Sequence, residues 1–122
     1  MPHILVIDDD EFFREMLVQM LNADGHKVTA TEDGAKGLAL LPRVQPDVIL
    51  TDILMPNMDG VEFIMALSRQ SNATPLIAMS GGRRSITSAF NLESAKLLGV
   101  KLTLTKPFTH TELRDAVREA LA

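Results

Sequence analysis

The chain has 122 residues, of which 46% are hydrophobic and 23% are charged, and its formal net charge at pH 7 is −4. This length fits one domain with a core of its own, and the composition excludes a disordered chain. The acidic balance argues against a nucleic-acid-binding role, which needs a concentrated basic face. No apolar run approaches the roughly 20 residues of a membrane span, and the absence of cysteine excludes disulfides and thiolate metal sites.

Short apolar runs alternate along the chain with longer stretches of helical period, a pattern typical of strand–helix units around a parallel sheet. Residues 4–7 predict the first buried strand. A helix follows, with Asp10 as its expected N-cap and Gly25 as a left-handed stop. Its apolar residues recur at four-residue spacing: Phe13, Leu17 and Leu21.

The second unit is predicted to lie at an edge of the sheet. Residues 26–31 alternate in polarity, with Val28 and Ala30 expected on one face. A short helix then runs up to Pro42, and its apolar residues are Ala35, Leu38, Ala39 and Leu41.

The third and fourth strands are predicted at residues 47–51 and 75–79. Both are apolar throughout, which favours central strands that are buried on both faces. The helix between them begins near residues 58–60, and it is expected to bury Phe63, Ile64 and Leu67.

The last part of the chain predicts a fourth helix over residues 84–98 and a fifth strand over 101–105, which alternates as an edge strand does. The final helix opens with Thr109 and Glu112 in a capping-box pattern. Its expected buried residues are Leu113, Val117 and Leu121.

Two predicted strands alternate in polarity, and the other three are apolar throughout. This pattern fits an α/β fold with a doubly wound, five-stranded parallel sheet in the flavodoxin-like order 2-1-3-4-5. In that order the first and third strands are neighbours, so Asp8, Asp9 and Asp52 meet at their carboxyl ends. Carboxylates about 4 Å apart repel by roughly 4 kcal/mol at an effective dielectric near 20, and they therefore need a divalent ion, a proton or a lysine nearby. Lys106, after the fifth strand, is such a lysine.

Four motifs follow strand ends in chain order: Asp8-Asp9, Asp52 with Met-Pro-Asn-Met-Asp-Gly at residues 55–60, Ser80-Gly81-Gly82 and Lys106-Pro107-Phe108. Taken singly, each has an ordinary reading as a helix cap, a turn, a flexible loop or a surface charge. Together they resemble the receiver domain of two-component response regulators, of the single-domain, chemotaxis-receiver-like kind. The likeness extends from Ile4 to Leu121.

The resemblance implies a phosphoacceptor. Asp52 would take a phosphoryl group from a sensor histidine kinase or a histidine phosphotransfer protein. Mg²⁺ would be bound by Asp9, Asp52 and the backbone carbonyl of Leu54, with Asp8 acting through water, a set that suits its near-octahedral preference. Lys106 would pair with Asp52 before transfer and with a phosphoryl oxygen after it, and Ser80 would donate its hydroxyl to another oxygen.

The chain departs from the family pattern at two places. The family usually has an aromatic residue three positions before the lysine, where this chain has Thr103, and there is no tyrosine anywhere. Gly81 and Gly82, with Pro107, form the loop and rim of the pocket and leave it open. We therefore expect the loop behind Ser80 to move more than residue 103 on phosphorylation.

Residues 1–122 are interpreted as a single receiver domain without an output domain, cytoplasmic, and acting on an unknown downstream protein without direct nucleic-acid contact or membrane insertion. It would catalyse its own phosphorylation and dephosphorylation, not turnover of a separate substrate. One alternative is a Mg²⁺-dependent phosphohydrolase with an Asp nucleophile, but that class usually has a second Asp where this chain has Leu54. Another is a degenerate receiver that serves as a binding module. His3, His26 and His110 are interpreted as surface residues.

Overall fold

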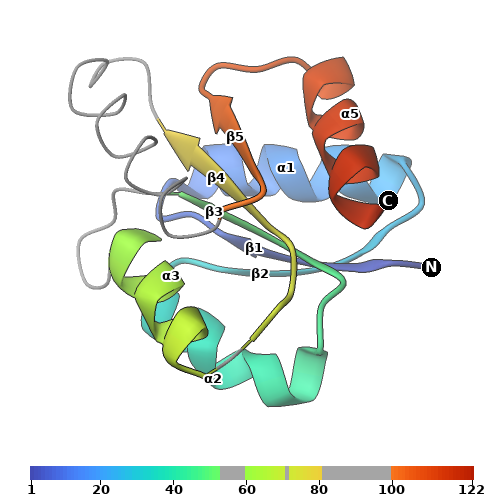
Figure 1. The fold of residues 1–122 in the computed structure, drawn as a ribbon. Coiled ribbons are helices and arrows are strands. Elements are labelled where there is room, and N and C mark those ends of the chain that lie inside the picture. Colours follow the sequence, from blue (N-terminus) through green and yellow to red (C-terminus); the bar gives the residue numbers. More distant parts are fainter. Residues whose placement is uncertain (53–59, 71, 81–99) are drawn as a thin grey trace.

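The computed structural model describes residues 1–52, 60–70, 72–80 and 100–122. Five parallel strands form one sheet in the order β2-β1-β3-β4-β5, which confirms the predicted fold (Figure 1). The strands are β1 His3–Ile7, β2 Lys27–Thr31, β3 Val48–Asp52, β4 Leu76–Ser80 and β5 Leu102–Thr105. The described helices are α1 Glu11–Ala23, α2 Gly34–Val44, α3 Gly60–Arg69 and α5 His110–Leu121.

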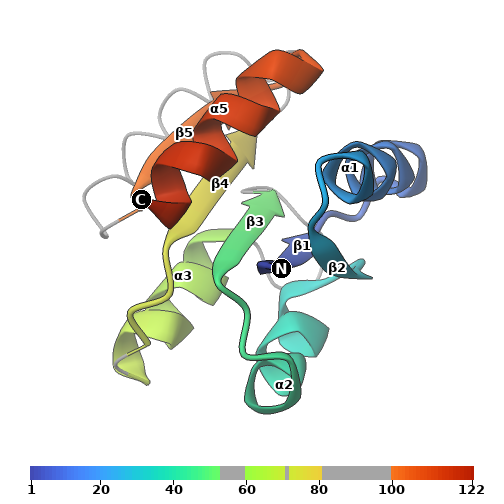
Figure 2. The same ribbon diagram turned by 90° about the vertical axis from the view of Figure 1, so that its right-hand side faces the viewer.

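Helices cover both faces of the sheet. The helices α1 and α5 lie on one face, and α2 and α3 lie on the other, as the two views together show (Figures 1 and 2). Successive residues of β1 therefore point into different cores: Ile4 and Val6 pack with α1 and α5, while Leu5 and Ile7 pack with α2 and α3. Burial on both faces explains why β1, β3 and β4 are apolar without alternation.

The α2 and α3 side of the core depends on one close approach. A Cβ atom added to Gly37 of α2 would lie 2.5 Å from Cδ1 of Ile7 and 3.4 Å from Cε1 of Phe63. Ile7 and Phe63 are fully buried, so an added methyl group would have to displace side chains of the core. A glycine at this position lets α2 lie against the sheet at this distance.

The helix ends follow the capping signals in the sequence. Asp10 is the N-cap of α1, and its side chain accepts a hydrogen bond from the backbone N–H of Phe13 at 3.1 Å. Gly25 follows that helix with φ of +87°, a left-handed conformation. Thr109 and Glu112 form the predicted capping box at the start of α5.

Several predictions of local detail are wrong. Helix α2 does not stop at Pro42 but continues to Val44, and its buried face consists of Gly34, Gly37 and Leu41, so that Ala35 and Ala39 are exposed. The prediction that β2 is an edge strand is confirmed, with Val28 half-buried and Ala30 exposed. Leu121 is 37% exposed, and Ala120 is buried in its place, because the buried face of α5 follows mixed three- and four-residue spacing.

The three histidines, predicted to be surface residues, are half-buried. Nε2 of His3 lies 2.7 Å from the hydroxyl of Thr29. Nε2 of His110, in the first turn of α5, lies 2.9 Å from Oδ2 of Asp24, and the guanidinium of Arg114 donates to Oδ1 of the same carboxylate at 3.0 Å. The two contacts of Asp24 join the end of α1 to α5.

No helix in the described part of the chain is long and apolar enough to cross a membrane. The helix predicted over residues 84–98 lies outside the described residues.

Candidate functional site

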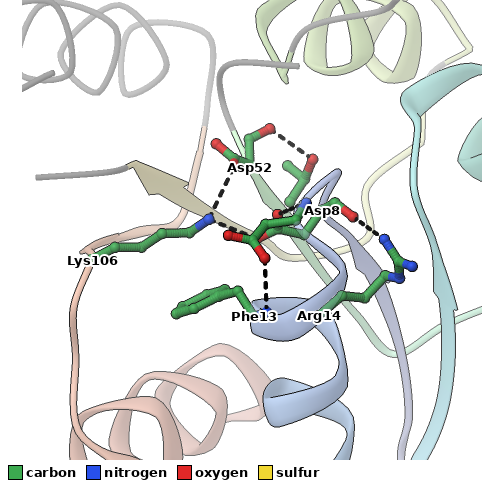
Figure 3. Close-up of polar contacts among 7 residues, drawn as sticks. Asp8, Phe13, Arg14, Asp52 and Lys106 are labelled. Carbon is green, nitrogen blue, oxygen red and sulfur yellow. Dashed lines mark hydrogen bonds and ion pairs between the residues drawn. The ribbon is translucent and has the colours of Figure 1, made fainter. Parts of the chain in front are cut away.

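The site lies at the carboxyl ends of β1, β3 and β5. Ile7 of β1 pairs with Thr51 of β3, so the chain reaches Asp8 and Asp52 at neighbouring positions of the two strands. Lys106 follows β5 directly, and its long side chain reaches across to both carboxylates (Figure 3). The sheet order thus brings together side chains that are as far as 98 positions apart in the sequence.

The ammonium of Lys106 bridges two carboxylates. Its Nζ atom lies 2.7 Å from Oδ2 of Asp8 and 3.0 Å from Oδ2 of Asp52. The side chain of Lys106 is 15% exposed, and that of Asp52 is 10% exposed. Both bonds are charge-assisted and shielded from water, which makes them stronger than surface ion pairs.

Hydrogen bonds engage both the side chain and the backbone of Asp8. The residue is fully buried, and its Oδ1 accepts a hydrogen bond from the backbone N–H of Asp10 at 2.9 Å. Its own backbone N–H donates to the carbonyl of Thr31 at 3.1 Å, and its carbonyl accepts from Nη1 of Arg14 at 2.8 Å. Both side-chain oxygens are therefore engaged, one by the backbone and the other by Lys106.

Asp9 completes an acidic cluster and is exposed, unlike Asp8 and Asp52. Each of the three residues contributes a carboxylate oxygen, and these oxygens all lie within 4.8 Å of one another. With Lys106 included, three carboxylates and one ammonium leave two net negative charges when all are ionised. A compact set of oxygen donors with this charge fits a hard divalent cation such as Mg²⁺.

The pKa values of Asp8 and Lys106 are both raised, but for different reasons. Burial raises the pKa of Asp8, although the hydrogen bond and the charge of Lys106 oppose the shift. Burial works against the charged form of Lys106, but the charge of Asp52 and the hydrogen bond to Asp8 outweigh it and raise the pKa of that ammonium. The lysine therefore stays charged at neutral pH.

Two aromatic residues that the sequence interpretation left out of the site lie beside it. The ring of Phe13, in the first turn of α1, lies under the ammonium of Lys106, and Phe108 packs against that ring. The helical period predicts only a core position for Phe13, and the motif at residues 106–108 gives no role to Phe108. Their positions, one turn after Asp10 and two residues after Lys106, were the available signal.

The remaining predicted site residues are placed only in part. Ser80 ends β4 opposite Thr105, and its side chain lies outside the described set. Thr103 is half-buried in β5 and pairs with Ala78, and Pro107 is exposed after a cis peptide bond. Leu54, Gly81 and Gly82 lie outside the described residues.

Comparison with known proteins gives consistent matches along the chain. A model of the response regulator receiver domain matches residues 4–118. The transcriptional regulatory protein CseB of Streptomyces coelicolor is 34% identical over 119 residues, which are 98% of this chain and 49% of the relative. The chain therefore spans about half the length of that regulator.

Solved structures show the same similarity in three dimensions. The chemotaxis protein CheY4 of Vibrio cholerae is 31% identical, with a TM-score of 0.88, and the match covers 99% of each chain. Full-length FixJ from B. japonicum is 30% identical, with a TM-score of 0.89, over 98% of this chain and 57% of that one.

Proposed function

Because the chain belongs to the response regulator receiver domain family, we propose that it accepts a phosphoryl group on Asp52 from a phosphohistidine of a partner protein. The observation that carries this proposal is the position of that carboxylate. It lies at a strand end with part of its surface open, and its Oδ2 is 3.0 Å from the ammonium of Lys106. A carboxylate oxygen beside a fixed positive charge is a nucleophile with a donor already in place for the group that it receives.

In the transfer step, an oxygen of Asp52 forms a bond to phosphorus while the bond between phosphorus and the imidazole nitrogen of the donor breaks. The nitrogen keeps the electron pair of the broken bond. Lys106 then donates to a phosphoryl oxygen, and attack of water on phosphorus later releases inorganic phosphate and restores the carboxylate. The residues of the chain mainly position the groups and stabilise charge, which is what phosphoryl transfer requires.

The acidic cluster fits a magnesium site in this proposal. Asp9 and Asp52 would be direct ligands with the backbone carbonyl of Leu54, and bound Mg²⁺ would offset the negative charge that an anionic donor meets. Both oxygens of Asp8 already accept hydrogen bonds from protein groups, which supports an indirect role through water for this residue. Millimolar Mg²⁺ should raise the melting temperature, because an ion that binds only the folded state stabilises it. The variant Asp9→Ala should lose this gain.

The output of the phosphorylated state is proposed to be a changed contact with another protein. A phosphoryl group adds about −1.5 to −2 charge and new hydrogen-bond acceptors. Ser80, at the end of β4, is expected to respond through its hydroxyl. CseB and MtrA, the latter a DNA-binding response regulator, are relatives of about twice this length, and direct nucleic-acid contact is not part of our proposal. We also propose that the protein is cytoplasmic.

Intact mass measurement with acetyl phosphate tests the function. We expect the wild-type protein to gain one phosphoryl group in Mg²⁺ and none with a chelator, and Asp52→Asn to gain none. Asp115→Asn is the matched control, because Asp115 is an exposed aspartate on α5 that does not belong to the acidic cluster. A wild-type protein that stays unmodified in Mg²⁺, or an Asp52→Asn protein that is labelled at the wild-type rate, would refute the proposal.

A further inference from the structure

The aromatic pair beside the acidic cluster has a specific role that the family assignment does not give it. We propose that Phe13, supported by Phe108, is a positioning residue for Lys106, and that its ring face holds the ammonium between Asp8 and Asp52. The consequence for phosphorylation depends on the proposed function, whereas the placement of the ammonium does not.

The geometry shows three attractive contacts on one charge. Nζ of Lys106 lies 4.2 Å from the centroid of the Phe13 ring, in addition to its bonds of 2.7 and 3.0 Å to the two carboxylates. Figure 3 shows the ring below the ammonium and Asp52 above it. An ammonium within about 6 Å of the centre of an aromatic ring, above its face, is attracted by the negative electrostatic potential of that face. The attraction is stronger here because Lys106 is largely shielded from water.

One contact of the ring and one of its backbone fix the position of Phe13. Phe108 packs edge-on against it, with ring centroids 5.4 Å apart and planes at 86°. Phe108 is 7% exposed and belongs to the core that α1 and α5 share. The backbone N–H of Phe13 donates to the N-cap Asp10, which fixes the backbone that carries the ring. The first turn of α1 and the segment before α5 therefore fix the ring together.

A ring suits this task for a chemical reason. The flexible four-carbon stem of lysine would otherwise allow its ammonium several positions near the two carboxylates. A third carboxylate could restrict it, but that group would add negative charge and compete for the metal. The ring attracts the ammonium without binding a proton, a metal ion or a phosphoryl group. It therefore restricts the ammonium without occupying a further oxygen of the cluster.

A role in core packing alone would predict different results, and substitutions can separate the two. Phe13→Leu keeps an apolar side chain but removes the ring face. Mono-, di- and trifluorophenylalanine at position 13 keep the shape of the ring while progressively reducing the negative charge of its face. Phe12→Leu is the matched control, because Phe12 is the preceding residue of the same helix and is 88% exposed.

The first measurement needs no phosphorylation. The methylene next to the ammonium of Lys106 should show an upfield NMR shift from the ring current of Phe13, in both the wild-type and Phe12→Leu proteins. That shift should disappear in Phe13→Leu. A wild-type protein without the shift, or a Phe13→Leu protein that keeps it, would overturn the inference.

The second measurement is the rate of phosphorylation by acetyl phosphate in Mg²⁺. We expect about a fivefold lower rate for Phe13→Leu than for Phe12→Leu, the size of a partly desolvated cation–π contact. The fluorinated proteins should slow in the order of fluorine content at unchanged melting temperature. Equal rates across that series would overturn the positioning role. If the wild-type protein shows the ring-current shift but is never phosphorylated, the proposed function fails while the placement of Lys106 by Phe13 stands.

Discussion

Replacement of Lys106 by methionine removes the charge that holds two carboxylates together, while it keeps most of the apolar stem. We expect Lys106→Met to lower the free energy of unfolding by about 3 kcal/mol in the absence of Mg²⁺. That value is the lower end of the range of about 3–5 kcal/mol for breaking a buried ion pair by removal of one partner. We use the lower end because the side chain of Lys106 is 15% exposed, so the ion pair is not fully buried.

The structure supports this magnitude in two ways. Fully buried Asp8 loses a partner at 2.7 Å, and Asp52 loses one at 3.0 Å. With carboxylate oxygens within 4.8 Å of one another, each unscreened pair repels by about 3–4 kcal/mol at an effective dielectric near 20. The cost is limited because burial has already raised the pKa of Asp8, so this residue can bind a proton when its partner is removed.

Urea denaturation at pH 7 and low ionic strength, followed by circular dichroism, gives the free energy of unfolding. The double variant Asp8→Asn with Lys106→Met should recover most of the loss, since a neutral amide at position 8 can still accept from the N–H of Asp10. Millimolar Mg²⁺ should also reduce the loss, because it supplies positive charge to the cluster. A Lys106→Met protein within about 1 kcal/mol of the wild type without Mg²⁺, or a double variant no more stable than Lys106→Met alone, would refute the reasoning.

Three further predictions concern other parts of the fold. The hydrogen bonds from α5 lower the pKa of Asp24 below its usual 3.8 against the opposing effect of burial, so this carboxylate stabilises the fold above about pH 4 and loses that effect as the pH falls through its folded pKa. The Asp24→Asn protein should therefore be less stable by about 1 kcal/mol at pH 7, and the difference should vanish in acid denaturation. Gly37→Ala should lower the free energy of unfolding by about 1 kcal/mol in urea, because overpacking against Ile7 exceeds the gain in helix propensity; a more stable protein would contradict the close approach. On addition of beryllofluoride and Mg²⁺, Ser80→Ala should lose the amide shift changes remote from the metal ligands while Thr103→Ala keeps them, and the reverse pattern would exclude the route through Ser80.

The fold was predictable because the sheet is buried on both faces. Continuous apolar runs in β3 and β4 identified central strands, and the capping residues Asp10 and Thr109 identified the starts of α1 and α5. The order of strands then implied that Asp8 and Asp52 meet, and the register of β1 with β3 shows why they do. Errors occurred where local signals compete with packing. Pro42 looks like a helix end, but α2 continues past it to Val44.

The supporting contacts of the site could not be predicted in the same way. Phe13 repeats with the helical period of α1, and that period says which face is apolar but not which partner the face meets. The ammonium of Lys106 comes to its ring only because the segment that follows β5 packs against the first turn of α1, through Phe108 and Phe13. Asp24 and His110, 86 positions apart, meet for a similar reason. Such contacts depend on how whole elements are placed, and no local spacing encodes them.

Identification of the modified residue tests the central claim most directly. Borohydride reduces an aspartyl phosphate to homoserine, and cleavage after arginine releases residues 44–69, a segment that contains Asp47, Asp52 and Asp59. After treatment with acetyl phosphate and Mg²⁺, peptide mass spectrometry should find homoserine at position 52 alone, and no conversion when Mg²⁺ is chelated. Conversion at position 47 or 59, or in a different peptide, with Asp52 unchanged, would contradict Asp52 as the phosphoacceptor.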